Sequence, residues 1–239
     1  MKLKLSHFRT KAIGLFTLNK NTRVNSSQSN GVINKITEMA VQDSADYAIK
    51  NFTEALIFDK RENLWDYCIT LAINAVCENP LIVEFGVWKG DSINYFARKL
   101  PSTRVLGFDS FEGLEEDWNG TSLSKGYFHM NGEVPKFEKN VEIYQGYFEE
   151  TVPELIGELK GSQIHILHMD ADTYKPTAYV LNSLSKNLKK GSIIIFDEFF
   201  GYPNFRSHEF KAWESFVTSR TLAFRCLGFT DKQIAVVLL

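Results

Sequence analysis

The sequence predicts an α/β fold of the Rossmann-like kind, in which helices flank a mostly parallel sheet of seven strands. Two observations carry this prediction. From residue 81 onward, short apolar runs alternate with segments of helical periodicity, a pattern typical of parallel sheets that are covered on both faces. The last two apolar runs are joined by a turn too short for a crossover helix, so they should pair as an antiparallel hairpin.

The expected elements follow one another along the chain with few interruptions. Two helical segments come first, at residues 32–58 and 61–78, and Asn79-Pro80 ends the second. Strands are expected at residues 81–85, 104–109, 141–145, 164–169, 192–196, 222–227 and 233–238. The later helices are expected at residues 91–99, 152–159, 173–188 and 206–217.

Composition and charge limit the classes of function. The net charge of −2 over 239 residues gives no basic footprint for nucleic acid. Residues 1–30 contain six Lys and Arg but no acidic residue, so they carry +6 and the rest of the chain carries −8. We expect these residues to form a polar tail, with a basic membrane-surface anchor as the alternative. No apolar run is long enough to span a membrane, and three scattered cysteines favour free thiols in the cytoplasm.

Glycines and acidic residues lie at the ends of the first two strands of the sheet, where ligands of such sheets bind. Gly86 and Gly90 lie in the turn after the first strand and let a ligand approach the backbone closely. Glu84 ends that buried strand and needs a hydrogen-bond donor, for which a cofactor amine is a candidate. Asp109 ends the second strand, where a carboxylate can accept both hydroxyls of a ribose.

The glycine pattern distinguishes between two classes of cofactor. Nicotinamide dinucleotides favour Gly-x-Gly-x-x-Gly, whereas residues 86–90 lack the middle glycine and place Trp88 in the turn. This turn and the terminal hairpin favour S-adenosylmethionine. The residues expected to contact the cofactor are Glu84, Gly86, Gly90, Ser92, Asp109, Ser110, Tyr147, Phe148 and Asp170.

Four carboxylates follow two later strands. Asp170 and Asp172 come after the strand at 164–169, and Asp197 and Glu198 come after the strand at 192–196. Such a cluster repels itself unless a cation, a proton or a substrate donor intervenes. A divalent ion such as Mg²⁺ would suit these ligands and would orient a substrate hydroxyl, leaving one carboxylate as the base. Asp172 also precedes a helix, so helix capping is the alternative role for it.

Two further segments are candidates for a functional role. His208 opens the last long helix close to Asp197 and is the second candidate for the base, with helix capping or a surface role as the alternative. Residues 110–134 form a long connection rich in aromatic side chains, which predicts a lid or a wall of the acceptor site. A small satellite hydrophobic cluster is the alternative.

Several of these segments resemble one known family. Residues 83–92, 107–114 and 170–174, together with Asp117-Trp118, are similar to class I S-adenosylmethionine-dependent methyltransferases of the macrocin and mycinamicin sugar O-methyltransferase family. The similarity covers roughly residues 50–238. It implies a methyltransferase domain at 80–239, preceded by helices at 31–79 that form the acceptor side.

The resemblance also implies roles for individual residues. S-adenosylmethionine is expected at the glycine turn and Asp109, and the methyl group is expected to pass to a sugar hydroxyl with the help of Mg²⁺. Asp172 is the implied base, and the implied metal ligands are Asp170, Asp197 and Glu198. The chain departs from the macrolide enzymes in one respect, because they typically carry Asp-Asp where this chain has Asp197-Glu198.

The sequence therefore predicts a cytoplasmic O-methyltransferase whose acceptor is a hydroxylated small molecule, with a sugar favoured. The alternatives are a nucleotide- or nicotinamide-dependent sugar-modifying enzyme and a non-catalytic protein with a cofactor fold. Neither nucleic-acid binding nor membrane association is expected, and a homo-oligomer is compatible with the sequence.

Overall fold

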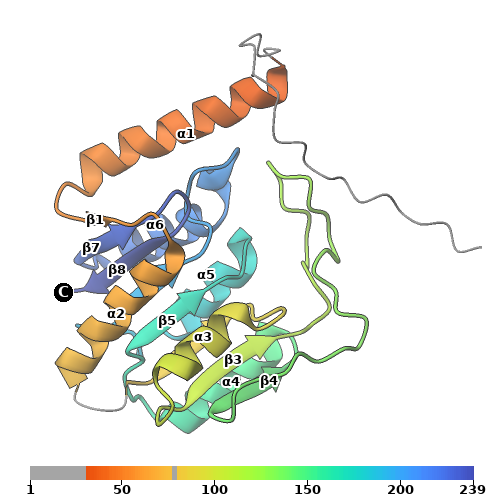
Figure 1. Ribbon diagram of the computed structural model, residues 1–239, viewed down its shortest axis with the longest axis vertical. Helices are drawn as coiled ribbons and strands as arrows, with labels where there is room; N and C mark the ends of the chain where they lie inside the picture. The colour runs from red at the N-terminus through yellow and green to blue at the C-terminus, as the bar shows by residue number, and fades with distance from the viewer. Residues whose placement is uncertain (1–30, 77–79) are drawn as a thin grey trace, which may run out of the picture. The chain divides into compact units, whose positions relative to one another are not determined.

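The computed structural model describes residues 31–76 and 80–239. The tail predicted at residues 1–30 and the end of the helix predicted at 61–78 lie outside the described residues. Val32–Leu239 form one compact unit, in which helices cover both faces of a central sheet (Figure 1).

Eight strands form this sheet within the described residues. They are β1 (Leu56–Ile57), β2 (Ile82–Phe85), β3 (Val105–Asp109), β4 (Val141–Gln145), β5 (Ile166–Met169), β6 (Ile193–Phe196), β7 (Phe224–Phe229) and β8 (Ile234–Leu238). Their order across the sheet is β1-β7-β8-β6-β5-β2-β3-β4. β8 runs antiparallel to both of its neighbours, and all other neighbouring strands are parallel. The predicted parallel sheet with an antiparallel terminal hairpin is confirmed.

β1 is the strand that the sequence does not predict. It has two residues, Leu56 and Ile57, and both are exposed, so no alternation of apolar and polar positions marks it. It pairs in parallel with β7 at one edge of the sheet. The preceding helix, α1 (Val32–Asn51), consequently ends earlier than the predicted residue 58, because the chain must turn at Phe52–Ala55 to reach this edge.

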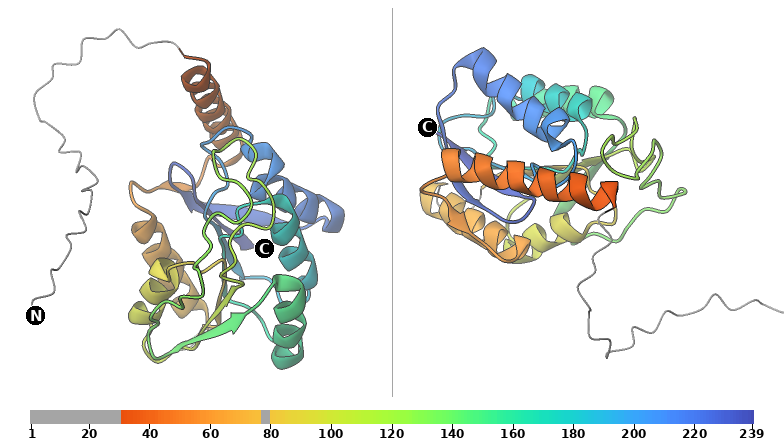
Figure 2. Two further views of the ribbon diagram at one scale, coloured as in Figure 1. Left: turned by 90° about the vertical axis from the view of Figure 1, so that its right-hand side faces the viewer. Right: turned by 90° about the horizontal axis from the view of Figure 1, so that it is seen from above.

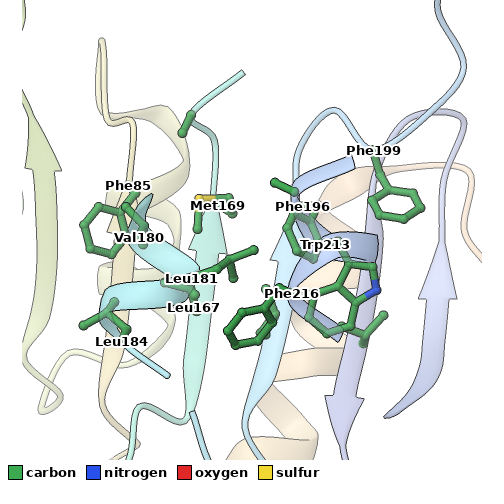
Figure 3. Close-up of a cluster of buried hydrophobic side chains, with 14 of the residues drawn as sticks. Phe85, Leu167, Met169, Val180, Leu181, Leu184, Phe196, Phe199, Trp213 and Phe216 are labelled. Atoms are coloured by element: carbon green, nitrogen blue, oxygen red, sulfur yellow. The ribbon is translucent and has the colours of Figure 1, made fainter. Parts of the chain in front are cut away.

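The remaining helices form two layers, one on each face of the sheet (Figure 2). α2 (Arg61–Val76) and α3 (Asp91–Lys99) cover one face. The other face is covered by α4 (Phe148–Leu159), α5 (Tyr174–Ser183) and α6 (Glu209–Arg220), the last of which follows a short 3-10 turn. Alternate strand residues face the two layers. Figure 3 shows the α5–α6 side of the core, where Phe196 of β6 packs against Trp213 of α6 with ring centroids 5.4 Å apart.

α1 crosses the carboxyl ends of the strands rather than a face of the sheet (Figures 1 and 2). Its C-terminal half packs on the segment between β6 and α6. Ser44 Oγ accepts a hydrogen bond from the N–H of Gly201 at 2.9 Å, and the Tyr47 ring lies 4.9 Å from that of Phe210. α1 therefore lies at the carboxyl ends of the strands, against the segment between β6 and α6.

The strand order changes direction at β2, which lies between β3 on one side and β5 on the other. In sheets of this kind such a switch point leaves a crevice outside the carboxyl ends of the strands. The turn at residues 86–90 follows β2 and borders this crevice. In the part of the chain that the structure describes, no helix is both long and apolar enough to cross a membrane.

Candidate functional site

A cavity of about 270 Å³ opens at the carboxyl ends of β2, β3, β5 and β6. Its volume is near the lower end of the range for small-molecule sites, about 300–1,000 Å³. The loops after β2, β3, β4, β5 and β6 line it, together with the first residues of α2 and α4 and one residue of α5. Of the predicted site residues, those that line it are Gly86, Asp109, Ser110, Tyr147, Phe148, Asp170, Asp172, Asp197 and Glu198.

The turn after β2 needs glycine at position 86. Gly86 has a φ of +86°, and a Cβ atom placed there would lie 1.8 Å from the backbone oxygen of Asp170. The loops after β2 and β5 are therefore in backbone contact, which brings the two predicted halves of the site together.

Asp109 shapes this turn through its carboxylate. Oδ2 accepts hydrogen bonds from the N–H groups of Val87 and Trp88, and Oδ1 accepts one from Phe111, each at 2.7 Å. A carboxylate offers about four lone-pair sites, so the three backbone bonds leave one for a ligand. Asp109 is partly exposed and lines the cavity, where that site is available to a ribose hydroxyl.

Glu84, Gly90 and Ser92 do not line the cavity. Glu84 is fully buried, and the donors that it needs come from the protein. Ser92 Oγ donates to Oε1 of Glu84 at 3.0 Å, and His168 Nδ1 lies 3.0 Å from Oε2. Burial raises the pKa of Glu84, and the hydrogen bond from His168 opposes this shift. Gly90, with a φ of +83°, precedes the first turn of α3.

His168 connects Glu84 to the acidic residues after β6. Its Nε2 lies 3.5 Å from Oδ1 of Asp197, and Gln233 donates a hydrogen bond to the same oxygen. Burial by itself would lower the pKa of His168, but its contacts with Asp197 and Glu84 outweigh burial and raise the pKa to about 9. The ring therefore lies between the carboxyl groups of Glu84 and Asp197, against Trp65 of α2 and Phe96 of α3.

Three other acids converge at the cavity. Asp170, Asp172 and Glu198 each place a carboxylate oxygen within 4.8 Å of the others. Burial raises the pKa of all three acids, and the charge of Asp197 adds to each shift. The pKa of Asp172 rises to about 8, and those of Asp170 and Glu198 are held well above their usual values. This trio (Asp170, Asp172 and Glu198) differs from the ligand set predicted from the sequence. Asp172 takes the place of Asp197, whose carboxylate faces His168 and Gln233.

Comparison with known proteins agrees with this geometry. Residues 83–199 match a family described as "Methyltransferase domain", and no curated protein matches the chain. The matched residues include the glycine turn, Asp109 and the trio, so the cavity lies within the part of the chain that is similar to a methyltransferase domain.

Solved structures of methyltransferases share the fold of this chain. The calicheamicin methyltransferase CalS11 is 23% identical, with a TM-score of 0.59 over 86% of this chain and 90% of that chain. An apo structure of CalS11, described as a TDP-rhamnose 3'-O-methyltransferase, is 22% identical with a TM-score of 0.51, over 86% and 92% of the two chains. The O-methyltransferase NovP is 15% identical with a TM-score of 0.50, over 86% and 97%. These likenesses establish the fold.

Glu209 is a buried acid near the cavity, and the sequence alone does not predict its role. The first residue of α6, it is 0% exposed. Its two oxygens accept hydrogen bonds from the N–H of Ala171 at 3.3 Å and from the N–H of Glu198 at 3.2 Å. Burial and the charges of nearby acids hold its pKa well above the usual value. Glu209 thus ties together the two loops that carry the trio. An acid in the first turn of a helix is too common to signal such a role.

His208, the second candidate for the base, contacts the backbone of the 110–134 connection. Its Nε2 lies 2.7 Å from the carbonyl oxygen of Asn119, so this nitrogen must carry a proton and donate it. His208 is buried, does not line the cavity and makes no side-chain capping bond to α6. Asn204 Nδ2 donates to the same carbonyl at 3.1 Å. The pair fastens the 110–134 connection to the start of α6.

The 110–134 connection is folded back on itself. Leu114 and Tyr127 are joined by a backbone hydrogen bond of 2.9 Å, and the Trp118 ring packs edge-on against Tyr202 at 5.6 Å. Leu114, Trp118 and Phe128 line the cavity. Phe128 in turn lies 5.0 Å from the ring of Trp88 in the glycine turn. The connection forms one wall of the site, and its buried side chains Leu114 and Trp118 belong to the main apolar core rather than to a separate cluster.

Proposed function

We propose that this methyltransferase moves the methyl group of S-adenosylmethionine to a hydroxyl group of a sugar or of another hydroxylated small molecule. One observation carries the proposal: a single cavity extends from the glycine turn and Asp109 to the trio. The first end suits the ribose of the cofactor, and the second suits an acceptor hydroxyl. CalS11 and NovP, which share the fold, are both described as O-methyltransferases, and this supports methyl transfer to oxygen.

The donor set of the trio fits a small divalent ion such as Mg²⁺. Mg²⁺ takes oxygen ligands at about 2.1 Å, so opposite ligands of one ion lie about 4.2 Å apart. The oxygens of the trio lie within 4.8 Å of one another, which small rotations of the carboxylates bring into this range. Burial and nearby negative charge raise the pKa of each member, so a cation bound there would stabilise the ionised carboxylates. A bound Mg²⁺ would supply Lewis acidity toward the acceptor hydroxyl.

Asp170 and Glu198 are the proposed ligands, with Asp172 facing the same point. Asp197, predicted from the sequence as a ligand, stays with His168 in this proposal. Asp172 is the proposed proton acceptor, because its carboxyl lines the cavity beside the two proposed ligands. As the acceptor oxygen attacks the methyl carbon, the carbon–sulfur bond breaks and the sulfonium becomes a neutral thioether. The hydroxyl proton passes to Asp172.

A tritiated-methyl transfer assay tests the proposal. The labelled cofactor is incubated with nucleotide sugars and with simple glycosides, and the products are separated and cleaved to find the labelled group. We expect label on a hydroxyl oxygen, and a large loss of transfer in Asp170→Asn. Glu154→Gln, which alters an exposed acid on α4, is the matched control and should transfer at the wild-type rate. Label on nitrogen or carbon would overturn O-methylation, and full activity of Asp170→Asn in chelator would overturn the metal.

The cytoplasm is the proposed location. Cys68 and Cys226 are free and buried, as is usual for proteins kept in a reducing compartment. A test is the localisation of a tagged full-length chain by fractionation, with recovery in the membrane fraction as the contrary result.

A further inference from the structure

We propose that Arg61 binds an anionic group of the acceptor, a phosphate or a carboxylate, while the acceptor hydroxyl lies at the trio. This inference rests on the proposed function for the position of the hydroxyl. It adds a chemical class to the acceptor, because a sugar with a negatively charged substituent would be favoured over a neutral sugar.

Arg61 has a distinct position in the cavity wall. It is the first residue of α2, and among the described residues that line the cavity it is the only one with a cationic side chain. It is also the only lining residue that comes from the segment 31–79. The helices predicted to form the acceptor side thus reach the cavity through this guanidinium.

The guanidinium of Arg61 is held in place by its neighbours. Its central carbon lies 5.0 Å from the centre of the Trp65 ring, a distance typical of cation–π contact. Trp65 is 1% exposed, and its Nε1 donates a hydrogen bond of 3.0 Å to Gln233. The platform beneath Arg61 is therefore rigid, which lowers the entropy that Arg61 loses when it binds a ligand.

The hydrogen-bond donors of Arg61 are available to a ligand. Within the described residues its one ion pair joins Nε to Glu62 at 3.7 Å, and both side chains are more than 40% exposed, so the pair contributes little. None of the acids of the described cavity wall lies within ion-pair distance of it, whereas Lys232 lies 3.7 Å from Glu198. Lys232, rather than Arg61, therefore has the position of a counter-ion for the trio. The planar fork of Arg61 instead suits two oxygens of a phosphate or carboxylate.

Calorimetry on the full chain saturated with S-adenosylhomocysteine tests this inference. The probes are thymidine diphosphate for phosphate, glucuronate for carboxylate and methyl rhamnoside as the neutral sugar. Wild type should bind at least one anion about tenfold more tightly than the neutral sugar, and Arg61→Gln should lose that preference, a change of about 1.4 kcal/mol. Arg61→Lys should retain part of the phosphate affinity but less of the carboxylate affinity. The arm that responds identifies the source of the anionic group.

Arg220→Gln is the matched control. Arg220 also stacks on an aromatic ring, Phe216 at 4.6 Å, but it does not line the cavity, so its removal should change no affinity. Equal binding of anions and neutral sugar by wild type, or wild-type anion affinity in Arg61→Gln, would overturn the inference. A fall in the affinity for S-adenosylhomocysteine itself would also overturn it, because Arg61 would then belong to the cofactor half.

The outcome is separable from that of the proposed function. If a neutral sugar hydroxyl is methylated and Arg61→Gln is fully active, O-methylation stands and the anionic subsite is wrong. If anions bind through Arg61 but label never reaches a hydroxyl, the anionic subsite stands and O-methylation is wrong.

Discussion

Asp109→Ala should weaken cofactor binding, because the Asp109 carboxylate shapes the turn at which we propose that the cofactor binds. The substitution removes the acceptor of three backbone N–H groups, those of Val87, Trp88 and Phe111. Trp88 has a φ of +45° and Phe111 a φ of +58°, conformations that are unfavourable for residues other than glycine. Without the carboxylate the turn should relax toward ordinary backbone angles.

The size of the effect follows from the bonds that are lost. A hydrogen bond to a charged group contributes about 1.5–3 kcal/mol, so the two bonds within the turn contribute about 3–6 kcal/mol together. Asp109 is partly exposed, and water replaces part of this, so about half remains. A loss of about 1.5–3 kcal/mol lowers the affinity for the cofactor by about ten- to 150-fold. The proposed bond to the ribose would add to this loss.

Calorimetric titration with S-adenosylhomocysteine measures the affinity, and thermal unfolding of the same samples shows whether the fold persists. Asp91→Asn is the matched control, because Asp91 is an exposed acid at the start of α3, next to the same turn. Asp109→Asn keeps the size of the side chain but offers one oxygen fewer, so its affinity should fall between those of wild type and Asp109→Ala. Folded Asp109→Ala with an affinity within about threefold of wild type would refute the reasoning.

Three further predictions concern the acids and the loop around them. The pKa of Asp172 is raised to about 8, so between about pH 4 and pH 8 the folded protein binds a proton there that the unfolded chain does not bind. The free energy of unfolding without metal should therefore fall as the pH rises toward 8. Thermal unfolding should show a larger stabilisation by Mg²⁺ at pH 8 than at pH 6, and Asp172→Asn should flatten both trends; equal trends in the variant would contradict this. Glu209→Gln cannot accept both backbone N–H groups, so methyl transfer should fall about tenfold with unchanged affinity for S-adenosylhomocysteine, and wild-type transfer would remove its proposed role. His208→Gln can still donate to the Asn119 carbonyl, so it should retain activity where His208→Ala loses acceptor affinity; inactivity of both with a lost acidic limb in the pH profile would instead point to a base.

The sequence predicts the sheet well because each buried strand has a strong local signal. Ile193–Phe196, for example, is an uninterrupted apolar run between glycine and acidic residues, and all four residues are buried. β1 has no such signal, since its two exposed residues are held only by pairing with β7. The loops that line the cavity are predicted along with the buried strands, because each of these loops follows the carboxyl end of a predicted parallel strand.

The partners of the acids could not be predicted, because they depend on which strands are neighbours. Glu84 and His168 are 84 positions apart in the chain but are directly paired in the register of β2 and β5. Only the strand order shows that an imidazole, rather than a cofactor amine, lies beside Glu84. The same applies to Glu209, whose two partners come from different loops.

Strand alternation explains which of the two consecutive acids after β6 faces the cavity trio. Ile193 and Ile195 face the α2–α3 layer, and Asp197 continues this parity toward His168 in the same layer. Glu198 has the opposite parity and joins Asp170 and Asp172. The division has an electrostatic consequence: His168 lies against one of the two acids that follow β6, whereas the other, Glu198, belongs to the trio and has Lys232 at 3.7 Å. One divalent cation and one transferable proton would together balance the charges of the three carboxylates of the trio.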